Sequence, residues 1–128
     1  MNVKNISTLI KIIFFIINNP FLLADEKTNN HKELAIHHFM QGEFLLNQGN
    51  YALAVLEFQD ALDIDPNAST IHISIADAYR RLGRSKHAED HLQIAIDLNP
   101  EELSSREMLG HLYTVSYTHL TLPTTPYV

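Results

Sequence analysis

In the middle of the chain, one pattern of apolar and polar residues occurs twice. Its glycine, alanine and proline positions recur at a fixed interval. The segment Gly49–Pro66 reads GNYALAVLEFQDALDIDP, and Gly83–Pro100 reads GRSKHAEDHLQIAIDLNP, 34 positions further on. Self-similarity at this period is typical of stacked helical repeats. The residue pairs that are identical at this offset are His38/His72, Gly49/Gly83, Ala54/Ala88, Gln59/Gln93, Ala61/Ala95, Asp63/Asp97 and Pro66/Pro100.

The spacing inside each copy predicts two helices joined by a sharp turn. Ala54 and Ala61 lie seven positions apart, so they share one helix face, where small side chains allow close helix packing. Phe58, between them on that face, would fill the space that remains. Gly49 falls where the chain must reverse, which favours a residue that tolerates positive φ. Pro66 ends the second helix, because the residue before a proline avoids the α region.

The pattern therefore predicts five helices and a short polar linker at Asp25–Asn30. The expected helices run from near His31 to Gln48, from Tyr51 to Ile64, from Ala68 to Leu82, from Ser85 to Leu98, and onward from near Glu101.

These residues, together with Tyr79, resemble the tetratricopeptide repeat (TPR) family. The resemblance implies an all-α solenoid of antiparallel helix pairs, with two full repeats and the first helix of a third. The expected segments are a linker and helix start at 25–34, repeats at 35–68 and 69–102, and a truncated third repeat at 103–114. His38 and His72 stand where the family carries an early aromatic residue, so we expect both rings to be partly buried.

Residues 1–24 predict a secretory leader, because two lysines and the apolar block Ile12–Ile17 precede Ala24, where cleavage could follow. We therefore expect export, to the bacterial periplasm. A membrane-spanning helix needs about 20 apolar residues, more than this block supplies. An uncleaved anchor in the inner membrane and a buried N-terminal helix are the alternatives.

The last segment, Val115–Val128, departs from the repeat pattern. Thr118, Leu120 and Leu122 alternate as in a strand, and Pro123 follows them. The string VSYTHLTLPTT resembles one translated reading frame of a transposase sequencing adapter, which implies a non-native tail and an array truncated near residue 114. The alternative is an extended or disordered C-terminal tail. Truncation would leave an apolar side of the second repeat uncovered.

Charge and candidate chemistry narrow the function. The net charge is −6, without the clustered Lys and Arg that nucleic-acid binding requires, and the chain contains no cysteine. His87 and His91 have a spacing that can hold zinc, but they do not form HExxH, and we expect both on a solvated face. The acidic pairs Asp60/Asp63 and Glu89/Asp90 also read as solvated, and no serine has a nucleophile motif. We expect no enzyme activity, metal or cofactor; a metal-dependent enzyme is a remote alternative.

The family resemblance implies a concave groove lined by the first helices of successive units, which would bind a protein or peptide partner. Its expected lining is Ile36, Phe39, Glu43, Leu46, Asn47, Thr70, Ile73, Asp77, Arg80 and Arg81. Phe39, Leu46 and Ile73 would provide apolar anchorage, and the two arginines could bind a carboxylate. Phe39 and Glu43 occupy the first two places of the Lys/Asn arrangement by which some family members grip a chaperone's C-terminal carboxylate. Alternatively, these residues only pack against neighbouring helices.

The sequence therefore favours a protein-binding adaptor of the cell envelope. A membrane-tethered repeat that drives oligomerisation, without a peptide ligand, is the competing hypothesis.

Overall fold

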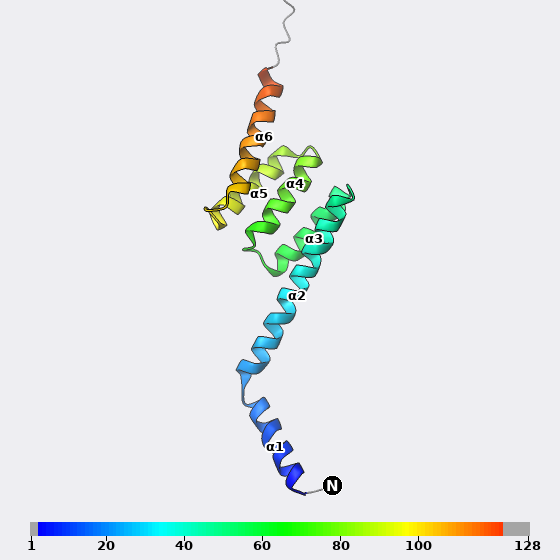
Figure 1. Ribbon diagram of the computed structural model, residues 1–128, viewed down its shortest axis with the longest axis vertical. Coiled ribbons are helices and arrows are strands. Elements are labelled where there is room, and N and C mark those ends of the chain that lie inside the picture. Colours follow the sequence, from blue (N-terminus) through cyan, green and yellow to red (C-terminus); the bar gives the residue numbers. More distant parts are fainter. Residues whose placement is uncertain (1–2, 122–128) are drawn as a thin grey trace, which may run out of the picture.

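The chain folds as successive antiparallel helix pairs (Figure 1). The computed structural model describes the backbone of residues 3–121 and the side chains of residues 5–19 and 27–118. The helices in this part of the chain are α1 (Val3–Ile17), α2 (Pro20–Asn47), α3 (Tyr51–Ile64), α4 (Ser69–Arg81), α5 (Ser85–Leu98) and α6 (Leu103–Thr121). The predicted all-α solenoid of two full pairs and one further helix is confirmed.

The second helix of each pair has the predicted bounds, whereas the first helix of the array is longer than expected. α2 begins at Pro20, so the linker predicted at Asp25–Asn30 is wrong and these residues continue the helix. Proline suits the first turn of a helix, and the polar residues that follow include neither proline nor glycine before Gly42. Polarity alone therefore does not interrupt a helix that has a good start.

Two left-handed glycines form the reversals within the pairs, as predicted. Gly49 has φ 82° and Gly83 has φ 73°. The N–H of Gly49 donates to the carbonyl of Leu46, and the next N–H donates to the carbonyl of Leu45. The same two hydrogen bonds occur 34 positions later, from Gly83 and the residue after it. This pair of hydrogen bonds satisfies the last carbonyl groups of the helix, and the chain then reverses its direction.

The core lies where α2 packs on α3, α4 packs on α5, and the two pairs stack through α3 and α4. The repeated alanines are fully buried, as are Phe58 and Leu92, which occupy the same place in the two units. Close helix approach is most evident at Gly42, where an added Cβ would lie 2.5 Å from the Phe58 ring. Small residues on one helix therefore create the space that a large side chain on its partner fills.

α6 packs on α5 and α4 as the first helix of a third unit (Figure 1). Leu112 and Ser105 are its buried side chains, and the Ser105 hydroxyl finds no hydrogen-bond partner among the described residues. Gly110 occupies the same repeat position as Gly42, yet no described atom lies within 4 Å of the place of its Cβ. The described residues leave this side of α6 uncovered at Gly110. The truncation stays a prediction.

The helical path of α6 continues through Thr121, so the strand-like or extended structure predicted from residue 115 is wrong as far as that residue. Two threonine side chains bond back to the helix: Thr114 Oγ1 donates to the Gly110 carbonyl, and Thr118 Oγ1 donates to the Thr114 carbonyl. Residues 122–128 lie outside the described residues. The adapter origin of the tail stays a prediction.

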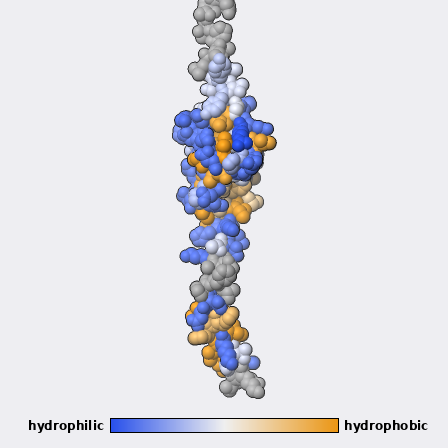
Figure 2. Space-filling view, turned by 90° about the vertical axis from the view of Figure 1, so that its left-hand side faces the viewer, coloured by the Kyte–Doolittle hydropathy of each residue, from blue (hydrophilic) through white to orange (hydrophobic). Residues whose placement is uncertain are grey.

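α1 contacts α2 alone among the described helices, and it projects from the repeat body (Figure 1). Its apolar side chains are exposed and form much of its surface, as Figure 2 shows at the lower end of the molecule. None of the described helices combines the length and the apolarity that are needed to cross a membrane. The secretory leader stays a prediction.

Candidate functional site

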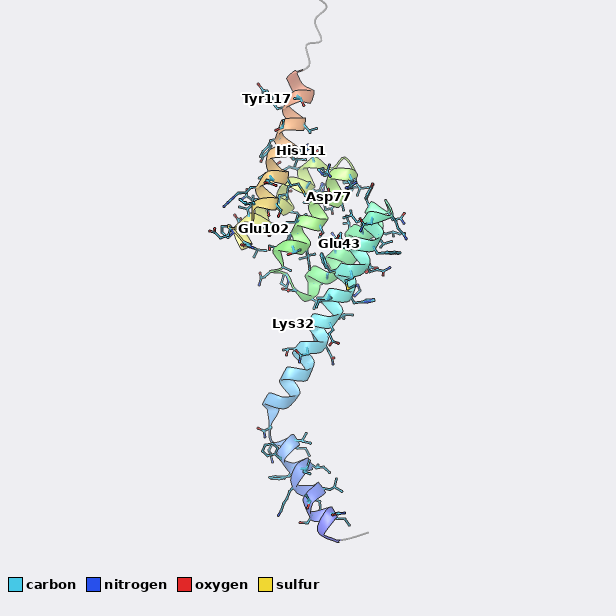
Figure 3. The ribbon with its side chains drawn as sticks, in the orientation of Figure 1. Lys32, Glu43, Asp77, Glu102, His111 and Tyr117 are labelled. Atoms are coloured by element: carbon cyan, nitrogen blue, oxygen red, sulfur yellow. The ribbon has the colours of Figure 1, made fainter. Side chains whose placement is uncertain are left out.

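Three first helices, α2, α4 and α6, present one row of side chains each along the same side of the array. Figure 3 labels a member of each row: Glu43 on α2, Asp77 on α4 and His111 on α6. These three residues are 34 positions apart, and His111 lines a hollow between α4 and α6. The groove that the resemblance implies along this side stays a prediction.

An apolar pocket of about 350 Å³ opens between α2 and α4. Ile36, Phe39 and Thr70, three of the predicted groove residues, line it. Ile36 is 56% exposed, so the pocket presents a free apolar side chain to solvent. The remaining lining residues are Lys32, Ala35, Asp65, Ala68 and Ile71. A pocket with apolar walls and a few charged groups at its edge suits the side chain of a bound polypeptide.

A second, more polar hollow of about 500 Å³ lies between α4 and α6. Arg80 is the α4 residue there, and α6 contributes Ser104, Glu107, Met108 and His111. An adjoining pocket of about 540 Å³ extends from Arg80 and His111 to Val115. The two ends of the groove therefore differ in character: the α2–α4 end is apolar, and the α4–α6 end carries charge.

Several predicted groove residues form ion pairs and hydrogen bonds, although Glu43, Asp77 and Arg81 line none of the hollows described above. Ser74 donates a hydrogen bond to Glu43, which links α4 to α2. Asp77 accepts hydrogen bonds from Arg80 and Arg81 on its own helix. Burial opposes the ionisation of Asp77, but the bonds from Arg81 and Arg80 outweigh it and lower the pKa of this carboxyl below its ordinary value of 3.8.

Both arginines that the sequence assigned to a ligand carboxylate are thus paired within the chain. Arg81 Nε lies 2.9 Å from Asp77 Oδ2, and its guanidinium carbon lies 5.6 Å from the centre of the Tyr51 ring on α3. A ligand carboxylate would have to compete with Asp77 for these groups. Arg80, which lines the α4–α6 hollow, is the better placed of the two.

The three predicted apolar anchors differ in what their side chains contact. Phe39 packs against Phe58, with ring centroids 5.9 Å apart, and Leu46 also packs against the buried core. Ile73 is half-buried. Phe39 therefore combines a packing role with a place in the pocket, whereas Leu46 is held by the core. Asn47 is exposed and lines none of the three pockets described above.

The sequence interpretation missed the α6 wall and Lys32. Ser104, Glu107 and His111 are the 34-residue equivalents of Thr70, Ile73 and Asp77. Extending the repeat offset once more would have found them. Lys32 precedes the first unit, so no repeat position marked it, although it lies within the first helix that the sequence predicted.

The early histidines replace packing aromatics, as expected, but they do so in different ways. His72 is 7% exposed, and its Nε2 lies 3.3 Å from the carbonyl oxygen of Pro66. Its Nδ1 lies 3.0 Å from Nδ1 of His91. His38 is half-buried and lies 2.9 Å from a carboxylate oxygen of Glu57. Each histidine thus contacts the second helix of its own unit.

The prediction that His91 lies on a solvated face is wrong. His91 is half-buried, because its ring stacks on Tyr79 with centroids 5.7 Å apart and also packs on His72. His87 is exposed, as predicted, although its ring lies 5.1 Å from that of Tyr79. Helix periodicity placed both histidines on the outer face of α5. It does not include the side chains of α4 that cover His91.

Acidification is expected to destabilise the second unit through His91. Burial, then the charge of His72 and, less, that of His87, lower the pKa of His91 from its ordinary value of 6.5, although Asp90 opposes this effect. The folded state therefore binds fewer protons than the unfolded state. The free energy of unfolding should fall as pH drops below about 6.5, toward the lowered folded pKa. Urea unfolding measured across this window checks the prediction.

His91→Gln should flatten this dependence on pH, whereas His37→Gln, at an exposed histidine on α2, should leave it unchanged. An equal slope in the wild type and His91→Gln would contradict the assignment.

Comparisons with known proteins bear on this geometry. Models of the tetratricopeptide repeat family match residues 28–69 and residues 69–102 of the chain. No curated protein matches the chain significantly.

Several solved structures share the arrangement of the helices. The first TPR of Spaghetti (RPAP3), bound to HSP90 peptide SRMEEVD, is 23% identical over 68% of this chain and 71% of that chain, with a TM-score of 0.65. The second TPR of Spaghetti, bound to the same peptide, is 22% identical over 73% and 85%, with a TM-score of 0.67. The TPR2AB domain of yeast Sti1, in its pHSP90 complex, is 14% identical over 86% and 43%, with a TM-score of 0.66.

These likenesses establish the fold. Adjacent matches from residue 28 to residue 102, on helix pairs that reverse at Gly49 and Gly83, show that the chain belongs to the tetratricopeptide repeat family.

Proposed function

We propose that the chain is a protein-binding module that takes a peptide segment of its partner into the groove formed by α2, α4 and α6. One observation carries the proposal: the first helices leave an open apolar pocket at Ile36, Phe39 and Thr70 between α2 and α4, and a polar hollow around Arg80 between α4 and α6. A partner segment would place an apolar side chain in the first and polar groups in the second. Protein interfaces usually combine an apolar core, which provides anchorage, with a polar rim.

The groove favours a partner other than an acidic C-terminus. The structural neighbours described above are bound to HSP90 peptides, among them SRMEEVD. In this chain Glu43, bonded to Ser74, carries negative charge into the middle of the groove, and Asp77 already occupies both arginines. A terminal carboxylate would therefore meet charge repulsion and would have to displace an existing ion pair. We propose an internal peptide segment as the ligand.

Ile36→Ala is expected to weaken peptide binding about tenfold, because removing a central apolar contact costs about 1–2 kcal/mol of binding free energy. Peptides are first selected by phage display on the wild-type chain, and their affinities are then measured by fluorescence anisotropy. Leu56→Ala is the matched control, because Leu56 is 57% exposed on α3, against 56% for Ile36. The free-carboxylate peptide SRMEEVD serves as the negative-control ligand.

Equal loss of affinity in both variants, or no loss in either, would contradict binding at this groove. Light scattering on the same samples addresses the competing hypothesis. Self-association of the wild type and both variants, without any selected peptide, would favour an oligomerising repeat over an adaptor.

We further propose that the module acts in the cell envelope, exported to the bacterial periplasm by the leader or held at the inner membrane by it. The exposed apolar side chains of α1, on a helix that contacts only α2 among the described helices, support this proposal. An apolar segment that the repeat body leaves uncovered is suited to recognition by export machinery. Fractionation of cells that express the chain, with and without residues 1–24, tests the location; an unchanged soluble cytosolic pool would exclude it.

A further inference from the structure

A histidine and two carboxylates from different helices of the first unit converge away from the groove. His38 lies on α2, and Glu57 and Asp60 lie one helical turn apart on α3. One potential ligand atom from each of the three side chains lies within 4.8 Å of the others. The grouping depends on helix packing, because His38 is 19 positions from Glu57 in the sequence. The groove residues take no part in it.

From this convergence we propose a divalent transition-metal site, with zinc as its natural test ion, formed by His38, Glu57 and Asp60. Zinc accepts imidazole nitrogen and carboxylate oxygen at about 2.0–2.2 Å, so ligand atoms around one ion lie about 3–3.5 Å apart. His38 Nδ1 and Glu57 Oε2 already lie 2.9 Å apart. Asp60 is exposed, so a change of its side-chain rotamer can complete the set without movement of either helix.

The pattern of charge and burial supports a cation here. The side chains of His38 and Glu57 are 26% and 30% exposed, so two of the ligands are partly desolvated and held in position. A hydrogen bond between these two residues does not require Asp60. Asp60 adds a second negative charge on the same face of α3, which is unfavourable without a positive group between the carboxylates. No described residue donates to the Asp60 carboxylate or pairs with it.

The second unit provides a natural contrast at the same repeat positions. There the residues are His72, His91 and Ile94, so two imidazoles meet without a carboxylate. His72 is buried, and its second ring nitrogen contacts a backbone carbonyl. The three-ligand arrangement with open coordination positions is therefore specific to the first unit. An ion bound there would connect α2 to α3 and would leave room for water as a further ligand.

Isothermal titration of the full chain with zinc sulfate, in metal-free buffer at about pH 7.5, tests the proposal, since neutral imidazole is the binding form there. We expect one zinc per chain and a rise in melting temperature on zinc addition. Asp60→Asn and Glu57→Gln should each weaken binding at least about tenfold and reduce the thermal shift. Both substitutions keep the side-chain shape, and circular dichroism verifies that the helices are intact.

Asp63→Asn is the matched control, because it removes the same charge from an exposed position on the same helix. It should bind zinc as the wild type does, and so should His91→Gln, which separates the site from the histidine pair of the second unit. Absence of zinc binding would overturn the proposal. So would equal affinities of Asp60→Asn and Asp63→Asn, or loss of binding in His91→Gln.

Discussion

Phe58→Ala is expected to lower the free energy of unfolding by about 3–5 kcal/mol, because it removes a large, fully buried aromatic side chain and leaves a cavity. Phe58 lies between Gly42 and Phe39 on α2 and belongs to the cluster that continues into α4. The loss would therefore affect both the pairing within the first unit and its stacking on the second. Urea unfolding followed by circular dichroism measures the change.

Phe44→Ala provides the control for this substitution. Phe44 is 57% exposed on α2, so the same truncation removes little buried area and should change the unfolding free energy by about 0.5 kcal/mol or less. Similar losses at the two positions would mean that the core does not lie between α2 and α3 as described.

Gly42→Ala and Gly110→Ala are expected to change stability in opposite directions, although both replace a glycine within a helix at the same repeat position. At Gly42 the new Cβ would lie 2.5 Å from the Phe58 ring, whose burial prevents it from moving aside. Overpacking of this kind costs about 1–3 kcal/mol. At Gly110 the Cβ would meet no described atom within 4 Å, so the gain in helix propensity of about 0.5–1 kcal/mol remains.

Thermal unfolding of the two variants beside the wild type distinguishes these effects. The melting temperature should fall for Gly42→Ala and rise for Gly110→Ala. A rise in both would show that α2 can move away from α3 at little cost, and a fall in both would place an unseen neighbour against α6.

The repeat offset predicted the architecture because each recurring residue answers a local physical requirement. The positive φ of Gly49 and Gly83 and the burial of Ala54 and Ala88 follow directly from turn geometry and helix periodicity. Such requirements are visible within one unit, so a single sequence is sufficient to recognise them. The bounds of α3 and α5 were predicted for the same reason.

The errors arose where neighbouring helices or chain context decide the outcome. The solvated position assigned to His91 was wrong because helix periodicity does not include the cover that Tyr79 and His72 provide from α4. The assignment of the α4 arginines to a ligand carboxylate stays a prediction; their pairing with Asp77 was not foreseen, because it depends on side-chain conformations that the sequence pattern does not specify. The linker prediction failed because polar composition was given more weight than the proline that starts α2.

The unpaired hydroxyl of Ser105 has a consequence for how the groove changes shape. A buried polar group without a partner costs about 1–3 kcal/mol, and Leu112 is the only other buried side chain among the described residues of α6. The packing of α6 on α5 and α4 therefore includes one buried group that opposes it. Glu107 and His111 lie on this helix, so a separation of α6 from α4 would widen the polar hollow and leave the apolar pocket between α2 and α4 unchanged.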